Sequence, residues 1–68
     1  YKDRFKAEYF QLKERYQRLR MTIAKYEDGT LNFKPDCSIE LLKRQAEAMR
    51  EYLYVMDMRA ELEHIDLE

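Results

Sequence analysis

The sequence predicts an all-α fold: an antiparallel two-helix hairpin, coiled-coil-like, that assembles into a homo-oligomeric helical bundle. Apolar residues recur at alternating spacings of four and three positions through both halves of the chain, which is the pattern of a helix face. A single turn signal, Asp28-Gly29, separates the two halves. With 68 residues the chain forms one domain, 1–68, and so small a core favours self-association.

The first helix is predicted over residues 2–27. Its apolar stripe keeps the heptad spacing for three repeats and consists of Phe5, Tyr9, Leu12, Tyr16, Leu19, Ile23 and Tyr26. Gly29 follows this stripe closely, and glycine readily adopts the left-handed conformation found just past a helix end. We therefore expect the first helix to stop at the Asp28-Gly29 pair.

A connector is predicted over residues 28–37, and the second helix over residues 38–64. Either Asp36 or Ser38 can cap this helix, because both side chains accept hydrogen bonds from the free N–H groups of a first turn. Glu40 lies in that first turn, where the helix dipole favours a negative charge. The connector is short, so the two helices are expected to pack side by side.

Two parallel stripes run along the second helix. The first consists of Leu42, Ala46, Met49, Leu53, Met56 and Ala60, and the second of Leu41, Gln45, Ala48, Tyr52, Val55, Arg59 and Leu62. One partner helix covers only the first, and large apolar patches rarely stay exposed. The second stripe therefore predicts contacts with another subunit. The alternative is that Tyr52 and Val55 only cover the edge of the hairpin.

Composition excludes several classes of protein. The chain has one cysteine, Cys37, and one histidine, His64, so a disulfide within the chain and a Cys/His zinc site are both excluded. A lone cysteine fits a reducing compartment. No apolar run approaches the roughly 18 residues of a membrane span, and no signal peptide, phosphate loop or catalytic triad is visible. We expect a cytoplasmic protein that is not an enzyme and that takes no cofactor or metal.

Charge is distributed unevenly between the two halves. Residues 1–27 hold eight Lys or Arg against four Asp or Glu, and residues 38–68 hold four against eight. Two helices lying side by side would neutralise each other; the other interpretation is a basic surface for an anionic partner. Pairs such as Glu27 with Lys43 and Lys13 with Asp57 face each other in the expected register. The acidic helix cancels much of the basic field, so nucleic acid is not an expected partner.

Two arginines, Arg20 and Arg50, are predicted to face each other at the middle of the hairpin. They should repel unless an anion lies between them, and planar guanidinium groups bind phosphate or carboxylate with two hydrogen bonds. These residues therefore form a candidate anion clamp. In the alternative interpretation both side chains bend towards solvent or towards acidic neighbours such as Glu47.

A second polar row is predicted on the other flank of the hairpin, formed by Arg15, Gln45, Tyr52 and Arg59. As a ligand site, it would stack a base on Tyr52 and hold phosphates with Arg15 and Arg59. As an interface network, it would pair Arg59 with Glu8 and stack Arg15 on Tyr52. The sequence leaves both interpretations open.

The order of residues also resembles a known family. Glu8, Leu12, Arg15 and Leu19, then Gly29, then Pro35-Asp36-Cys37, and finally Leu41, Leu42, Gln45, Ala48, Met49, Tyr52, Met56 and Arg59 are similar to the pattern of small phage and prophage hypothetical proteins related to one from a crAss-like bacteriophage. This resemblance covers nearly the whole chain and implies a phage origin and a helical hairpin. In architecture alone the chain is also similar to the hairpin phage sponges that block the cyclic-nucleotide-based and Thoeris defences.

These resemblances imply a function in the cytoplasm of an infected host cell. The resulting hypothesis is a homo-oligomeric phage counter-defence protein that sequesters an anionic, cyclic nucleotide immune signal between its subunits, without catalysis. The candidate ligand-binding residues are Arg15, Arg20, Gln45, Arg50, Tyr52 and Arg59. One alternative is a protein-binding inhibitor of a host defence enzyme, of anti-CRISPR type. Another is a phage structural or assembly accessory protein.

Overall fold

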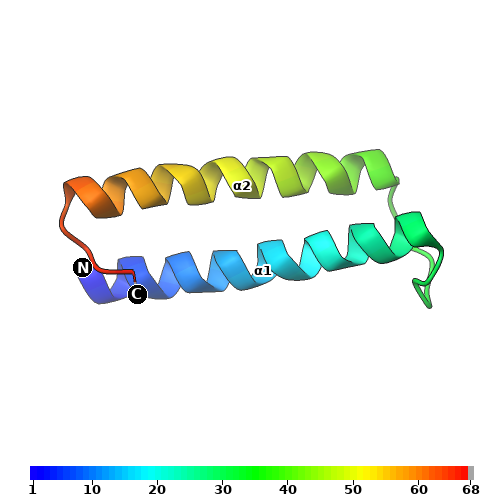
Figure 1. Ribbon diagram of the computed structural model, residues 1–68, viewed down its shortest axis with the longest axis horizontal. Helices are drawn as coiled ribbons and strands as arrows, with labels where there is room; N and C mark the ends of the chain where they lie inside the picture. Colours follow the sequence, from blue (N-terminus) through cyan, green and yellow to red (C-terminus); the bar gives the residue numbers. More distant parts are fainter. Residues whose placement is uncertain (68) are drawn as a thin grey trace.

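The computed structural model describes residues 1–67 and confirms the predicted all-α hairpin. Helix α1 spans Lys2–Asp28 and helix α2 spans Ile39–Leu62. The two helices run antiparallel, and the connector closes one end of the hairpin while both chain ends lie at the other (Figure 1). The molecule is elongated, with extents of 42 × 18 × 17 Å. No helix within residues 1–67 is both long and apolar enough to cross a membrane.

Helix α1 ends as the sequence predicts. Gly29 has φ 80°, in the left-handed region, which glycine adopts without the steric cost of a Cβ atom. The N–H of Thr30 donates to the carbonyl of Lys25 at 2.9 Å, and the N–H of Gly29 donates to that of Tyr26 at 3.3 Å. These two bonds form a Schellman motif. The carboxylate of Asp28 accepts from the N–H of Thr30 at 3.0 Å and so orders the start of the connector.

Helix α2 begins with a side-chain cap. Of the two candidates for this role, Asp36 and Ser38, the structure selects Ser38, whose Oγ accepts from the N–H of Leu41 at 3.2 Å. A serine in this position satisfies one N–H that the helix leaves without a partner. Glu40 lies in the first turn, as expected.

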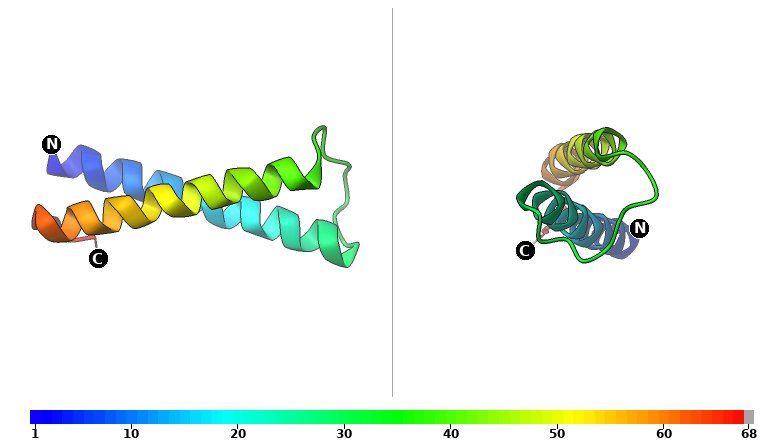
Figure 2. Two further views of the ribbon diagram at one scale, coloured as in Figure 1. Left: turned by 90° about the horizontal axis from the view of Figure 1, so that it is seen from above. Right: turned by 90° about the vertical axis from the view of Figure 1, so that its right-hand side faces the viewer.

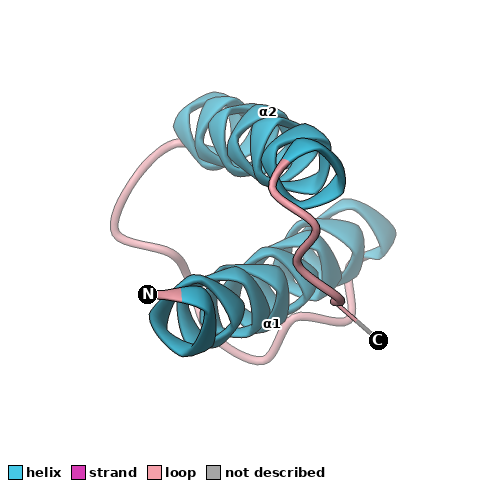
Figure 3. Ribbon diagram, turned by 90° about the vertical axis from the view of Figure 1, so that its left-hand side faces the viewer, coloured by secondary structure: helices cyan, strands magenta, loops and turns pink. Residues whose placement is uncertain are grey.

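The end of α2 differs from the prediction, because the helix stops at Leu62 and not at residue 64. His64 has φ 57°, and its N–H donates to the carbonyl of Glu61 at 3.4 Å. The N–H of Ile65 donates to the carbonyl of Ala60 at 2.8 Å. This is a second Schellman motif, with histidine where glycine is common. It turns the chain back, and the tail runs from the end of α2 towards α1 (Figure 3).

Replacing His64 with glycine is expected to stabilise the hairpin by about 0.5–1 kcal/mol, because the left-handed conformation penalises a residue with a Cβ atom. A gain of this size corresponds to a rise in Tm of roughly 2–8 °C for a domain of this length. Thermal unfolding followed by circular dichroism at 222 nm measures it. Gly29→Ala is the matched control and should lower Tm, since Gly29 has φ 80°. An unchanged or lower Tm for His64→Gly would contradict the expectation.

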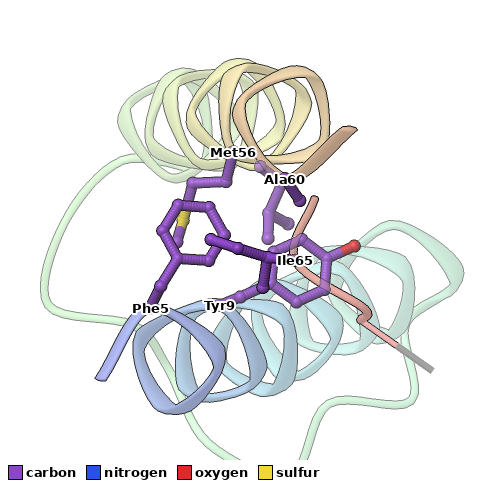
Figure 4. Packing of buried hydrophobic residues seen from close by; sticks show 6 residues of the cluster. Phe5, Tyr9, Met56, Ala60 and Ile65 are labelled. Atoms are coloured by element: carbon purple, nitrogen blue, oxygen red, sulfur yellow. The ribbon is translucent and has the colours of Figure 1, made fainter. Parts of the chain in front are cut away.

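The core is concentrated at the end of the hairpin that holds the chain ends. Phe5 and Tyr9 of α1 pack against Met56 and Ala60 of α2, and Ile65 of the tail lies beside Tyr9 (Figure 4). Met56 is the most buried of these residues, with 2% of its surface exposed. The tail thus supplies a third segment to a core that two helices alone would leave open.

The helices cross one another when the hairpin is viewed from above (Figure 2). Towards the connector the buried set is thinner and comprises Ile23 and Ala46. The two stripes of α2 have different environments. The first stripe is buried or half-buried throughout, whereas the second consists of exposed residues. A single hairpin therefore covers one stripe only, as the spacing of the residues predicts.

Candidate functional site

An open groove runs along one flank of the hairpin, between α1 and α2. Its larger part has a volume of about 630 Å³ and continues into a second hollow of about 560 Å³, within the range of small-molecule sites in proteins. The two parts share Tyr16, Arg20, Ala24 and Arg50. The predicted arginine pair therefore lines the middle of this groove.

The two arginines have different partners in the groove. The guanidinium carbon of Arg20 lies 5.7 Å from the centre of the Tyr16 ring. Arg50 donates from Nε at 3.3 Å and from Nη2 at 3.0 Å to one carboxylate oxygen of Glu47. This bond raises the pKa of Arg50. Arg50 thus adopts the alternative considered from the sequence, in which its side chain bends towards Glu47.

The groove continues past the arginines to a cluster around Tyr9. Burial, followed by a hydrogen bond with the Asp57 carboxylate, raises the pKa of the Tyr9 hydroxyl. Nζ of Lys13 lies 6.0 Å from the centre of the Tyr9 ring. The predicted pairing of Lys13 with Asp57 is therefore replaced by contacts that both residues make with Tyr9. By contrast, the predicted ion pair between Glu27 and Lys43 is confirmed, at 3.0 Å.

These side chains give the groove a definite chemical character. Four cations line the two parts of the groove, Lys13, Arg20, Lys43 and Arg50, together with three carboxylates, Glu27, Glu47 and Asp57. Lys43 is paired with Glu27, and the Tyr54 ring is 56% exposed in the larger part. Guanidinium groups bind phosphate with paired hydrogen bonds, and exposed aromatic rings stack on planar groups. The arrangement is suited to an anion that also carries a flat ring. Among the described residues no group of His, Cys, Asp and Glu side chains is placed to hold a metal ion.

The polar row on the opposite flank is arranged differently from its prediction. The hydroxyl of Tyr52 donates to the carboxylate of Glu8, which raises the pKa of Tyr52. Arg59 donates from Nε to Glu63 at 2.9 Å, and its guanidinium carbon lies 5.0 Å from the centre of the Phe5 ring. The predicted pairing of Arg59 with Glu8 is therefore wrong, because the end of α2 supplies a carboxylate one turn away.

Glu63 is also the acceptor for the hydroxyl of Tyr1, at 2.5 Å. The hydrogen bonds from Tyr1 and then from Arg59 lower the pKa of the Glu63 carboxyl. Arg59 is thereby held in a hydrogen-bond network with Tyr1 and Glu63 at the end of the hairpin that carries the chain ends. Arg15 and Gln45 are exposed on the same flank. The rings approached by cations within residues 1–67 are Phe5, Tyr9 and Tyr16, so the predicted stacking of Arg15 on Tyr52 is wrong as well.

The structure brings together two of the six predicted ligand-binding residues, Arg20 and Arg50, in one hollow. It adds Lys13, Tyr16 and Tyr54 to them. The signal for Lys13 was its position seven residues before Arg20, on the same face of α1. Tyr54 lies four residues after Arg50 on α2, so its side chain follows the same flank.

The fold and the groove define a class: a small helical hairpin with an open, arginine- and tyrosine-lined groove between its two helices. The chain matches the Sequestin family over residues 1–62 and belongs to that family. No curated protein and no solved structure gave a match in the corresponding comparisons.

Proposed function

We propose that the chain is a homo-oligomeric phage counter-defence protein that binds and sequesters an anionic, cyclic nucleotide immune signal at its subunit interfaces. The observation that carries the proposal is the pair of arginines, Arg20 and Arg50, in a groove that also exposes tyrosine rings. The family name, Sequestin, is compatible with sequestration of a ligand. The architectural similarity to hairpin sponges points in the same direction.

Binding by this groove would proceed by exchange of partners. An incoming phosphate displaces Glu47 from Arg50 and accepts paired hydrogen bonds from the guanidinium group. Arg20 supplies a second positive charge across the groove, and Lys13 extends the cationic wall. Tyr16 and Tyr54 offer ring faces to a base. Binding of this kind holds a nucleotide without changing it, which is what sequestration requires.

The groove is open along its length, so a single hairpin leaves part of a bound nucleotide in water. A second copy lying over the groove would cover that part and slow release. The proposal therefore includes an oligomer, and it places the signal between subunits. This is also the reason for expecting tight binding by so small a protein, since buried ligand surface and exclusion of water strengthen each ionic hydrogen bond.

Isothermal titration calorimetry against a panel of cyclic dinucleotides, cyclic trinucleotides and ADP-ribose derivatives tests the proposal. With the protein at about 50 μM, even a micromolar Kd gives measurable heat. We expect one nucleotide to bind with a nanomolar Kd and to be recovered unchanged after heat denaturation of the complex. Absence of heat with every member of the panel would refute the proposal. Co-purification of one host enzyme in place of a nucleotide would instead favour the protein-binding inhibitor.

A further inference from the structure

The second stripe of α2 is an apolar feature that the hairpin leaves uncovered. It runs along the flank of α2 opposite the groove. Leu62 is 80% exposed, Leu41 52%, Tyr52 50% and Val55 40%. These four side chains are spread over the full length of α2, so the exposed apolar surface is a band that extends along the helix.

The total surface of the chain indicates how much surface a partner should cover to make the assembly as compact as other proteins of this size. A compact monomer of 8.4 kDa exposes about 4,600 Å², whereas this hairpin exposes 5617 Å². The surplus is roughly 1,000 Å², and a stable protein–protein interface hides about 800 Å² on each partner. One interface with a partner of similar size would therefore remove the surplus.

We infer that this partner is a second copy of the chain, and that the two α2 helices pair antiparallel across a two-fold axis near Tyr52. The order of residues in the second stripe is suited to such pairing. Leu41 meets Leu62 of the second copy, and Ala48 meets Val55 of the second copy. Tyr52 lies against Tyr52 of the second copy. We call this contact between the second stripes of the two α2 helices the seam. Leucines meet at both of its ends, and a small residue, Ala48, faces the larger Val55 between each end and the axis.

Charge selects the antiparallel arrangement over the parallel one. Arg59 is the only charged residue in the second stripe. In a parallel pair Arg59 would face Arg59 of the second copy, and like charges that face each other across two paired helices disfavour that orientation. The Glu63 carboxylate of each chain offsets part of this repulsion. In the antiparallel pair it faces Gln45 of the second copy, whose carbonyl oxygen accepts a hydrogen bond from a guanidinium N–H. In this arrangement Gln45 binds Arg59 of the second copy, and this role of Gln45 does not depend on a nucleotide.

The seam specifies how the copies of the chain associate in the proposed function. In this respect the inference rests on the proposed function, which requires an oligomer. It lies on the flank opposite the groove, so both grooves remain open in the pair. A covered groove then requires a further contact between pairs, with the nucleotide in between. Seam and nucleotide site are consequently separate surfaces, and each can be tested while the other is intact.

Cross-linking distinguishes the two orientations of the seam. In a Cys37→Ser background, Leu41→Cys and Leu62→Cys chains are mixed and treated with a short bismaleimide, one chain carrying a tag so that the mixed product has its own mass. We expect the cross-linked product in the mixture and not with either variant alone. Cross-linking of each variant with itself would indicate a parallel pair and overturn the inference. Met21→Cys, at an exposed position on the groove side, measures the background level of cross-linking between chains that do not meet at the seam.

Light scattering without nucleotide tests the seam a second time. The native chain at tens of micromolar should have at least the mass of two copies. Val55→Asp should reduce the mass of a dimer to that of one copy, and it should lower the mass of a larger assembly. Met21→Asp is the matched control and should leave the seam in place. Circular dichroism at 222 nm verifies that the variants fold. A native chain with the mass of one copy, or a Val55→Asp chain of unchanged mass, would refute the seam. Calorimetry tests nucleotide binding in a separate experiment, so failure of the seam and failure of the proposed function can be distinguished.

Discussion

Met56→Ala is expected to unfold most of the molecule at room temperature. Met56 is 2% exposed and packs within the cluster that joins α1, α2 and the tail. Truncation of a buried methionine to alanine costs about 2–5 kcal/mol, since the cavity it leaves is only partly filled by its neighbours. A domain of this length has about 3–5 kcal/mol of stability in total. The expected loss is therefore comparable with the whole free energy of unfolding.

Met58→Ala is the matched control, two residues further along α2. Its side chain is 42% exposed, and surface substitutions change stability by about 0.5 kcal/mol or less. Urea titrations followed at 222 nm compare the two variants at the same protein concentration, because self-association would couple stability to concentration. Equal midpoints for Met56→Ala and Met58→Ala would show that the cluster around Met56 does not hold the hairpin together.

The second large effect is expected on nucleotide binding, from replacement of both groove arginines. Arg20→Ala and Arg50→Ala should each weaken binding about 10- to 100-fold, since a hydrogen bond to a charged group contributes about 1.5–3 kcal/mol. The double variant should weaken it at least about 100-fold, with less than additive loss if one phosphate contacts both residues. Calorimetry with the nucleotide identified by the panel measures these changes.

Two further variants separate the clamp from a general effect of charge. Arg44→Ala removes one positive charge from an exposed position of α2 outside the groove, and its Kd should stay within about twofold of native, because exposed charges are screened by salt. Glu47→Gln should tighten binding, because Arg50 loses the carboxylate that competes with the ligand. Equal weakening by Arg44→Ala and Arg50→Ala would contradict a clamp at this position.

Several features of the hairpin follow from local sequence alone. The end of α1 at Gly29 uses a signal within a few residues of the helix end. Local sequence also places a cap before α2, but it leaves Asp36 and Ser38 as equal candidates, and the structure selects Ser38. The burial of one stripe of α2 and the exposure of the other follow from periodicity, since residues three and four apart share a helix face. The mutual position of Arg20 and Arg50 follows from the same periodicity, together with a connector short enough to set the register.

The choice among partners within reach of one side chain, and the position of the tail, depend on tertiary packing. Arg59 pairs with Glu63 in place of Glu8, and Asp57 with Tyr9 in place of Lys13. Exposed ion pairs differ by about 1 kcal/mol or less, so side-chain geometry, and not residue type, selects between them. Ile65 joins the core through a left-handed histidine, a conformation that local preference disfavours and that burial of an apolar side chain compensates.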